Sequence, residues 1–245
     1  MRVLFLTISL FVSCSAFSQK ILGAVMTDEN GITNDQQKAK FLVVEKQIND
    51  TAFEKLEYNF AGPMINRATF KDKALTILNG DYADYHENGY LATTGRYSNN
   101  KKDGVWYIYN DTSKAITELK FHLDLLVSKM DMDSMAKVNE RIKRDTTGEV
   151  EASYPGGIGK VRSLISSKFN LPQRTISLRK GGTVKIRFLI DTTGDVKGIS
   201  VLQSVEFAFD EEAMRVISLM KKWNPASEKG KKVIAYRIQP ITVSL

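Results

Sequence analysis

Residues 181–204 read GGTVKIRFLIDTTGDVKGISVLQS, and this stretch decides the fold of the C-terminal part of the chain. Apolar residues alternate with polar ones along its first half, at Val184, Ile186, Phe188 and Ile190. Because successive side chains of a strand point to opposite faces, this alternation predicts a strand with one buried face. Asp191–Asp195 is rich in turn-forming residues, and residues 196–204 return the chain. The stretch therefore predicts an antiparallel hairpin.

Two amphipathic helices are predicted on either side of this hairpin. The first follows a turn at Tyr154–Gly157 and ends before Pro172, and one face carries Ile158, Val161, Ile165 and Phe169. The second is capped by Asp210 and stops before Pro225, with Glu211 and Glu212 in the first turn, where the helix dipole favours acids. Its inner stripe consists of Ala213, Val216, Ile217, Met220 and Trp223.

One more strand is predicted over Val233–Leu245. Ile234, Tyr236 and Ile238 share one face, but after Pro240 the apolar set shifts to Ile241, Val243 and Leu245. This change of parity predicts a bulge. Proline cannot donate to a hydrogen-bond ladder, so the strand is expected at the edge of a sheet. An open edge is a liability unless something occupies it.

The order and spacing of six short motifs resemble the C-terminal domain of TonB, especially its Bacteroidetes-type form. The motifs are YPGG at 154–157, DTTG at 191–194, DEEA at 210–213, WNPA at 223–226, GKKV at 230–233 and PITVSL at 240–245. Each motif alone is weak, but the six occur in the order of the family. The resemblance implies an α+β fold for residues 151–245, made of a helix, a β-hairpin, a second helix and a final edge strand.

The resemblance also implies a non-enzymatic, energy transducer-like protein of the periplasm that acts in transmembrane transport. In TonB domains the last strand receives an extended peptide of an outer-membrane TonB-dependent receptor by strand addition. Carried onto this chain, the peptide-binding residues are Val233, Ile234, Tyr236, Arg237, Ile238, Gln239, Ile241 and Val243. No cofactor and no metal are implied. TonB proper has an uncleaved membrane anchor followed by a long Pro-rich spacer. This chain is expected to have a signal peptide and a folded β region in their place, and it contains five prolines. We therefore expect a stand-alone adaptor.

Residues 19–150 are predicted to form an antiparallel β-meander, because short runs of strand formers alternate with breakers. The runs include 41–44, 58–60 and 75–78, and the breakers are Asn49-Asp50, Gly62-Pro63, Lys71-Asp72 and Asn79-Gly80. For residues 35–48 a helix remains an alternative. Further along, alternation at Leu119, Phe121, Leu123 and Leu125 predicts one strand, and a polar helix is predicted from Asp133 to Arg144. The polar run from Asp145 to Glu151 is the predicted boundary between two independently folding units.

Residues 80–110 resemble the MORN-type hairpin repeat of bacterial envelope proteins. Asn88-Gly89 and Asp103-Gly104 predict tight turns, since such pairs tolerate positive φ, and Gly80, Gly95, Tyr82, Tyr97 and Trp106 recur around them. The aromatic residues are expected to form hairpin core. The alternative is an exposed aromatic face that binds glycan or protein.

Residues 1–18 are expected to be a cleaved signal peptide. Arg2 is followed by an apolar run from Val3 to Ser13, and Ala16-Phe17-Ser18 places small residues before Gln19. The alternatives are an uncleaved anchor and lipidation at Cys14, the only cysteine. After cleavage no disulfide remains, and removal of Arg2 lowers the net charge from +7 to +6. The basic residues lack the interleaved aromatics of a nucleic-acid groove, so a nucleic acid is not an expected partner.

No catalytic pattern is predicted. His86 and His122 lack ligand spacing, and neither a phosphate loop, a calcium loop nor a serine or zinc hydrolase motif occurs. Three hypotheses about function follow. The first is the peptide-binding adaptor, the second is a structural protein attached to peptidoglycan or the membrane surface by its hairpins and basic face, and the third is an enzyme with an unrecognised site. Homodimerisation is left open.

Overall fold

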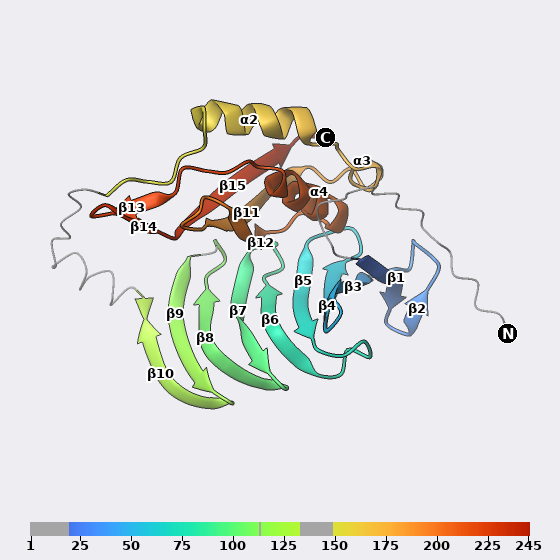
Figure 1. The fold of residues 1–245 in the computed structure, drawn as a ribbon. Coiled ribbons are helices and arrows are strands. Elements are labelled where there is room, and N and C mark those ends of the chain that lie inside the picture. Colours follow the sequence, from blue (N-terminus) through green and yellow to red (C-terminus); the bar gives the residue numbers. More distant parts are fainter. Residues whose placement is uncertain (1–19, 113, 133–148) are drawn as a thin grey trace.

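The computed structural model describes residues 20–112, 114–132 and 149–245, which form a sheet-dominated α+β fold (Figure 1). Within them, ten strands form one antiparallel sheet in the order β10-β9-β8-β7-β6-β5-β4-β3-β1-β2. The strands are β1 Lys20–Asp28, β2 Gly31–Thr33, β3 Phe41–Asn49, β4 Ala52–Asn59, β5 Met64–Phe70, β6 Leu78–Tyr85, β7 Leu91–Ser98, β8 Lys101–Tyr109, β9 Ala115–His122 and β10 Leu125–Asp131. From β3 to β10 neighbours in the chain are neighbours in the sheet, so the predicted meander is confirmed.

The second part of the chain lies across one end of these strands (Figure 1). It contains helices α2 Gly157–Lys168, α3 Gln173–Ser177 and α4 Phe207–Ser218, and strands β11 Gly182–Ile190, β12 Val196–Gln203, β13 Ala226–Glu228, β14 Lys231–Val233 and β15 Ala235–Val243. One sheet has the order β12-β11-β15, and β13 and β14 form a separate hairpin. The hairpin predicted at residues 181–204 is confirmed, and the alternating residues Val184, Ile186, Phe188 and Ile190 are at most 1% exposed.

Two predicted features of the meander are wrong because non-glycine residues adopt positive φ. The β7–β8 turn is Asn99-Asn100, with φ of 49° and 69°, whereas Asp103-Gly104 lies inside β8. The single strand predicted through Leu119–Leu125 is a hairpin, since Leu123 and Asp124 turn the chain with φ of 49° and 74°. The turn at Asn88-Gly89 is confirmed, where the Gly89 N–H donates to the His86 carbonyl over 2.8 Å.

The structure also corrects two smaller predictions and decides between strand and helix at a third position. Residues 41–49 form β3, so the helix considered over 35–48 is wrong. The run at 75–78 is a loop up to its last residue, because Leu75 has a φ of 55°. Asn79-Gly80 does not break the chain and lies inside β6. The predicted signal peptide, Cys14 and the helix predicted from Asp133 to Arg144 lie outside the described residues.

A row of aromatic rings crosses the hairpins of residues 80–110. The centroid of Tyr97 lies 5.2 Å from that of Tyr82 and 5.2 Å from that of Trp106, and Trp106 is 2% exposed. The indole lies against the backbone of Gly95, where an added Cβ would come within 2.1 Å of it. Trp106 therefore packs as hairpin core, as predicted. The resemblance to MORN repeats stays a prediction.

The first predicted helix begins and ends close to α2, whereas the second differs from α4 at both ends. α4 ends at Ser218, so Met220 and Trp223 of the predicted inner stripe lie beyond it. Asp210 was predicted to cap α4, but the cap is Glu206, whose carboxylate accepts the Ala208 and Phe209 N–H groups at 3.1 and 2.9 Å. The acid-rich run Asp210–Glu212 misleads because it lies inside the first turns of the helix. In α2 the predicted inner face is also wrong at its start, since Ile158 is 60% exposed.

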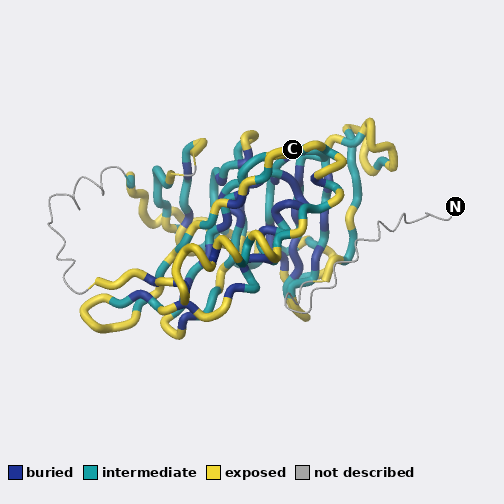
Figure 2. The backbone as a smooth tube through the Cα atoms, turned by 90° about the horizontal axis from the view of Figure 1, so that it is seen from above, coloured by how far each residue is buried: buried dark blue, intermediate teal, exposed yellow. Residues whose placement is uncertain are grey.

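One hydrophobic core joins the two parts of the chain. The same cluster contains Leu56, Tyr58 and Met64 of the large sheet together with Phe207 and Ile217 of α4. Buried residues are dark blue in Figure 2, which looks down on the second part as it lies over the large sheet. The boundary near residue 150 stays a prediction. The shared core nevertheless argues that the two parts unfold together, because separating them would expose apolar surface on both.

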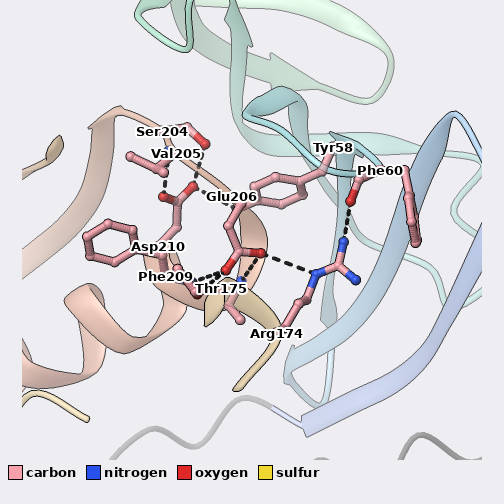
Figure 3. Close-up of polar contacts among 10 residues, drawn as sticks. Tyr58, Phe60, Arg174, Thr175, Ser204, Val205, Glu206, Phe209 and Asp210 are labelled. Atoms are coloured by element: carbon pink, nitrogen blue, oxygen red, sulfur yellow. Dashed lines mark hydrogen bonds and ion pairs between the residues drawn. The ribbon is translucent and has the colours of Figure 1, made fainter. Parts of the chain in front are cut away.

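Buried polar contacts accompany this core (Figure 3). The Asp210 carboxylate accepts hydrogen bonds from the Ser204 hydroxyl, from the Val205 N–H at 3.0 Å and from the Tyr58 hydroxyl of β4 at 3.3 Å. Beside it, Arg174 of α3 donates both to Glu206 and to the carbonyl of Phe60. Carboxylates at the start of α4 therefore organise contacts that reach Tyr58 of β4 and the carbonyl of Phe60 just after β4.

Burial raises the pKa of Asp210 to about 8, and the hydrogen bonds from Ser204 and Val205 only partly oppose this. The unfolded carboxyl titrates near its ordinary pKa of about 4, so between about pH 4 and pH 8 the folded state binds the extra proton. Stability from this group is therefore fully present at low pH and is lost as pH rises through the folded pKa.

Asp210→Asn is expected to remove this dependence, because an amide keeps the acceptor oxygen and has no proton to lose. Its free energy of unfolding, measured in urea, should improve relative to that of the unaltered chain as pH rises from about 5 to about 9. Asp50→Asn, in an exposed turn, serves as the control. A constant difference between the Asp210→Asn and unaltered curves across this range would contradict the prediction.

Candidate functional site

β15 is an edge strand. It pairs antiparallel with β11 from Ala235↔Ile190 to Val243↔Gly182, and no strand in the described ranges pairs with its other side. The prediction that the last strand lies at a sheet edge is confirmed. Such an edge displays a row of backbone N–H and C=O groups that an extended chain can pair with.

The eight residues predicted to bind a peptide do not share one strand. Val233 ends β14 and Ile234 follows it, whereas Tyr236, Arg237, Ile238, Gln239, Ile241 and Val243 lie in β15. The expected bulge at Pro240 is wrong, because β15 pairs with β11 in continuous register through this residue. The apparent change of parity arises because both faces of the strand carry apolar residues.

The two faces of β15 differ sharply in exposure. Tyr236 and Ile238 point to one face and are 69% and 54% exposed, while Ile241 on the other face is 6% exposed. Ile241 packs in the core with β11 and the helices. The exposed face beside the edge is therefore apolar and uncovered within the described residues.

Pro240 shows which backbone groups face outward. In a regular antiparallel ladder, alternate residues direct both N–H and C=O to the partner strand or away from it. Proline has no N–H to give to the ladder, so its position fits the outward set. The side-chain amide of Gln239 donates to the Pro240 carbonyl at 2.8 Å, which is consistent with a carbonyl that accepts no hydrogen bond from β11. The outward amides then belong to Tyr236, Ile238 and Thr242.

A groove of about 360 Å³ runs beside this edge. Its floor belongs to the helix-facing side of the sheet, and its walls are the start of α2 and the segment that precedes it. The lining residues are Glu151, Ala152, Ser153, Tyr154, Gly157, Ile158, Val161, Phe188, Trp223, Arg237, Ile238 and Gln239. A strand added to β15 would direct every second side chain toward this groove.

The wall segment is held firmly by backbone pairing. Val150 exchanges two hydrogen bonds with Ser227, and Ser153 exchanges two with Asn224, all between 2.8 and 3.0 Å. Ala152 and Tyr154 are 3% and 8% exposed and belong to the core. The groove is therefore bounded by ordered backbone on both sides.

Polar groups in the groove centre on Arg237. Its guanidinium donates to the Ala152 carbonyl and to the Glu151 carboxylate, the latter at 3.0 Å. Its Nε and the indole Nε1 of Trp223 are buried and have no hydrogen-bond partner within the described residues. Trp223 makes an edge-to-face contact with Tyr154 and a tilted contact with Phe188, with centroid distances of 5.3 and 5.8 Å. The sequence predicted Arg237 as a site residue but assigned Trp223 to the core alone.

The described part of the chain shows no arrangement of residues typical of a metal site. It contains no group of three or more His, Cys, Asp or Glu residues placed to hold a metal ion. The His86 ring lies 3.3 Å from the Tyr109 carbonyl, and that of His122 lies 3.6 Å from Asp103. Among the described helices, none has the length and apolar character needed to cross a membrane.

Comparison with known proteins finds a family model that covers the edge strand. The family model described as Gram-negative bacterial TonB protein C-terminal matches residues 167–243. An NMR solution structure of the Helicobacter pylori TonB C-terminal domain is similar at 25% sequence identity, covering 36% of this chain and 79% of that chain with a TM-score of 0.30. No curated protein matches. The candidate edge and most of the groove floor thus lie inside the segment that matches the TonB C-terminal family model.

Proposed function

We propose that this chain is a non-enzymatic, TonB-like binding protein of the cell envelope. It binds an extended segment of an outer-membrane protein, which adds as a strand to β15. The observation that carries this proposal is the open edge of β15, whose outward backbone groups lie beside a groove. The match of residues 167–243 to the TonB C-terminal family model supports the class of partner.

Strand addition would use both the backbone of the β15 edge and the side chains on either side of it. Backbone hydrogen bonds supply affinity with little dependence on sequence, and pockets on either side select alternate side chains. One set of peptide side chains would meet the exposed face of Tyr236 and Ile238, and the other set would enter the groove. Burial of these two apolar side chains would contribute roughly 25 cal/mol per Å² of covered surface.

The large sheet serves in this proposal as the platform that holds the binding part. Residues 19–150 would form this platform and residues 151–245 the binding domain, with export directed by residues 1–18. Contacts such as the hydrogen bond from the Ser204 N–H to the Gly89 carbonyl, 2.8 Å long, fix β12 against the β6–β7 turn. A fixed β15 edge is pre-organised for pairing, which lowers the entropic cost of binding.

The proposal is tested by photo-crosslinking. A photoreactive phenylalanine analogue placed at Tyr236 should label one segment of an outer-membrane protein in envelope preparations, and a synthetic copy of that segment should compete. Ile32, 75% exposed on β2 at the far edge of the large sheet, provides the matched control position. Equal labelling from both positions, or labelling that the synthetic segment does not reduce, would reject strand addition at β15.

The structural alternative has its own supporting observation. β10, at the other end of the large sheet, exposes Leu125, Leu126, Val127 and Met130 by 39% to 69%. An apolar edge of this kind could attach to another envelope component. Binding to isolated peptidoglycan or lipid vesicles that survives Ile238→Pro and is lost on Leu126→Lys would favour this function.

A further inference from the structure

We propose that the groove beside β15 selects peptides with an acidic side chain, which binds the guanidinium of Arg237 in place of Glu151. This inference rests on the proposed function, because it concerns the peptide that pairs with β15. The acceptor would be an Asp or Glu carboxylate of an extended segment. Glu151 would then be an internal occupant that the peptide displaces.

Two unused hydrogen-bond donors point to a missing acceptor. Trp223 is 8% exposed, and within the described residues its Nε1 has no partner; the same is true of the buried Nε of Arg237. Both residues line the groove. Buried polar groups in proteins are nearly always paired, so two unpaired donors on residues that line one groove require an explanation. Both atoms are enclosed by protein, so an incoming carboxylate would first meet the Nη groups of Arg237, and Nε would become available when the side chain moves with Glu151 displaced. A carboxylate has two acceptor oxygens and can bind a guanidinium through two parallel hydrogen bonds.

The present partner of Arg237 is easily replaced. Glu151 accepts a hydrogen bond from Arg237 Nη2 at 3.0 Å, but its side chain is 88% exposed. An ion pair with so exposed a partner contributes little, because water screens it. The backbone around Glu151 is fixed by the pairing of Val150 and Ser153, so only the Glu151 side chain has to move.

The position of Arg237 suits a strand paired with β15. Arg237 and Gln239 direct their side chains to the groove side of the sheet, and a neighbouring strand places alternate residues on the same side. Directly opposed side chains on adjacent strands lie about 5 Å apart at Cβ, within reach of an arginine. Once Glu151 turns to solvent, Arg237 is the one charged residue among those that line the groove. Charge complementarity then favours an acid over an amide or a base.

The test uses the mature chain, residues 19–245, and a display library of random eight-residue peptides. Peptides selected on the unaltered chain should be enriched in Asp or Glu at one position of the aligned set. For a selected peptide and its Glu→Gln counterpart, affinity should differ on the order of tenfold. Arg237→Met should erase this difference, mainly by weakening the binding of the Glu peptide. Glu151→Gln should strengthen binding of the Glu peptide, since the internal competitor loses its charge.

Failure of the inference and failure of the proposed function give different results. One outcome is a set of peptides whose binding is abolished by Ile238→Pro but which show no enrichment in acidic residues, or which prefer a basic residue opposite Glu151. This outcome would contradict the acid-selecting groove and would still support strand addition. Absence of peptides that depend on the β15 edge overturns both. Equal circular dichroism spectra and melting temperatures of the Arg237→Met and unaltered chains exclude a folding defect, and Arg237→Lys, which keeps the charge, should retain part of the discrimination.

Discussion

Ile238→Pro is expected to abolish peptide binding while leaving the chain folded, whereas Arg237→Pro is expected to disrupt the sheet. The Pro240 argument assigns the Ile238 amide to the free edge and the Arg237 amide to the ladder with β11, where Arg237 pairs with Phe188. Proline at an outward position removes one donor and places its ring where the added strand would lie. Proline at the inward position breaks a bond of the internal ladder and disturbs the core at Phe188, which is 1% exposed.

The two variants are compared by thermal unfolding and by affinity for peptides that bind the unaltered chain. The adjacent positions control for each other, since both introduce proline into the same strand. Ile238→Ala provides a further control that trims the side chain and keeps the amide; it should weaken binding only modestly, as should Tyr236→Ala. If Ile238→Pro keeps full affinity, or if Arg237→Pro remains as stable as the unaltered chain, the assigned direction of the amides is wrong.

Much of the C-terminal part could be predicted because its patterns are local. The alternation from Val184 to Ile190 fixed both the strand and its buried face, and proline at 240 marked the edge. The start of α4 was missed because Glu is a less usual cap than Asp, and the cap here depends on Arg174 and Thr175, which lie about thirty residues away in the sequence. The bulge was a false inference, since an exposed apolar face at Tyr236 and Ile238 mimicked a change of register.

The turns of the large sheet and the groove illustrate what local patterns cannot show. Asn99-Asn100 and Leu123-Asp124 turn the chain with positive φ, although glycine is the usual residue for this conformation. The groove combines Arg237 with Glu151, which is 86 residues away in the chain. Such a site follows from the tertiary packing of α2 and its preceding segment, so no spacing within the sequence reveals it.

Glu206→Ala is expected to lower the free energy of unfolding by about 3–5 kcal/mol, as for removal of one partner of a buried ion pair. Glu206 is fully buried and accepts from Ala208, Phe209, Thr175 and Arg174. Its removal takes away the helix cap and leaves Arg174 without its carboxylate. Glu206→Gln should cost less, because the amide keeps the shape and an acceptor for the first turn of α4.

The two tryptophans of the chain report on its two parts separately, since Trp106 lies in β8 and Trp223 beside the groove. In Trp223→Phe and Trp106→Phe backgrounds, urea unfolding followed by the remaining tryptophan should give one cooperative transition. Glu206→Ala should shift both reports by the same amount, because Phe207 and Asp210 of α4 both contact Tyr58 of β4 in the shared core. A shift confined to the Trp223 report, with the Trp106 transition unmoved, would mean that the large sheet is stable alone and that the boundary near residue 150 separates two independent folding units.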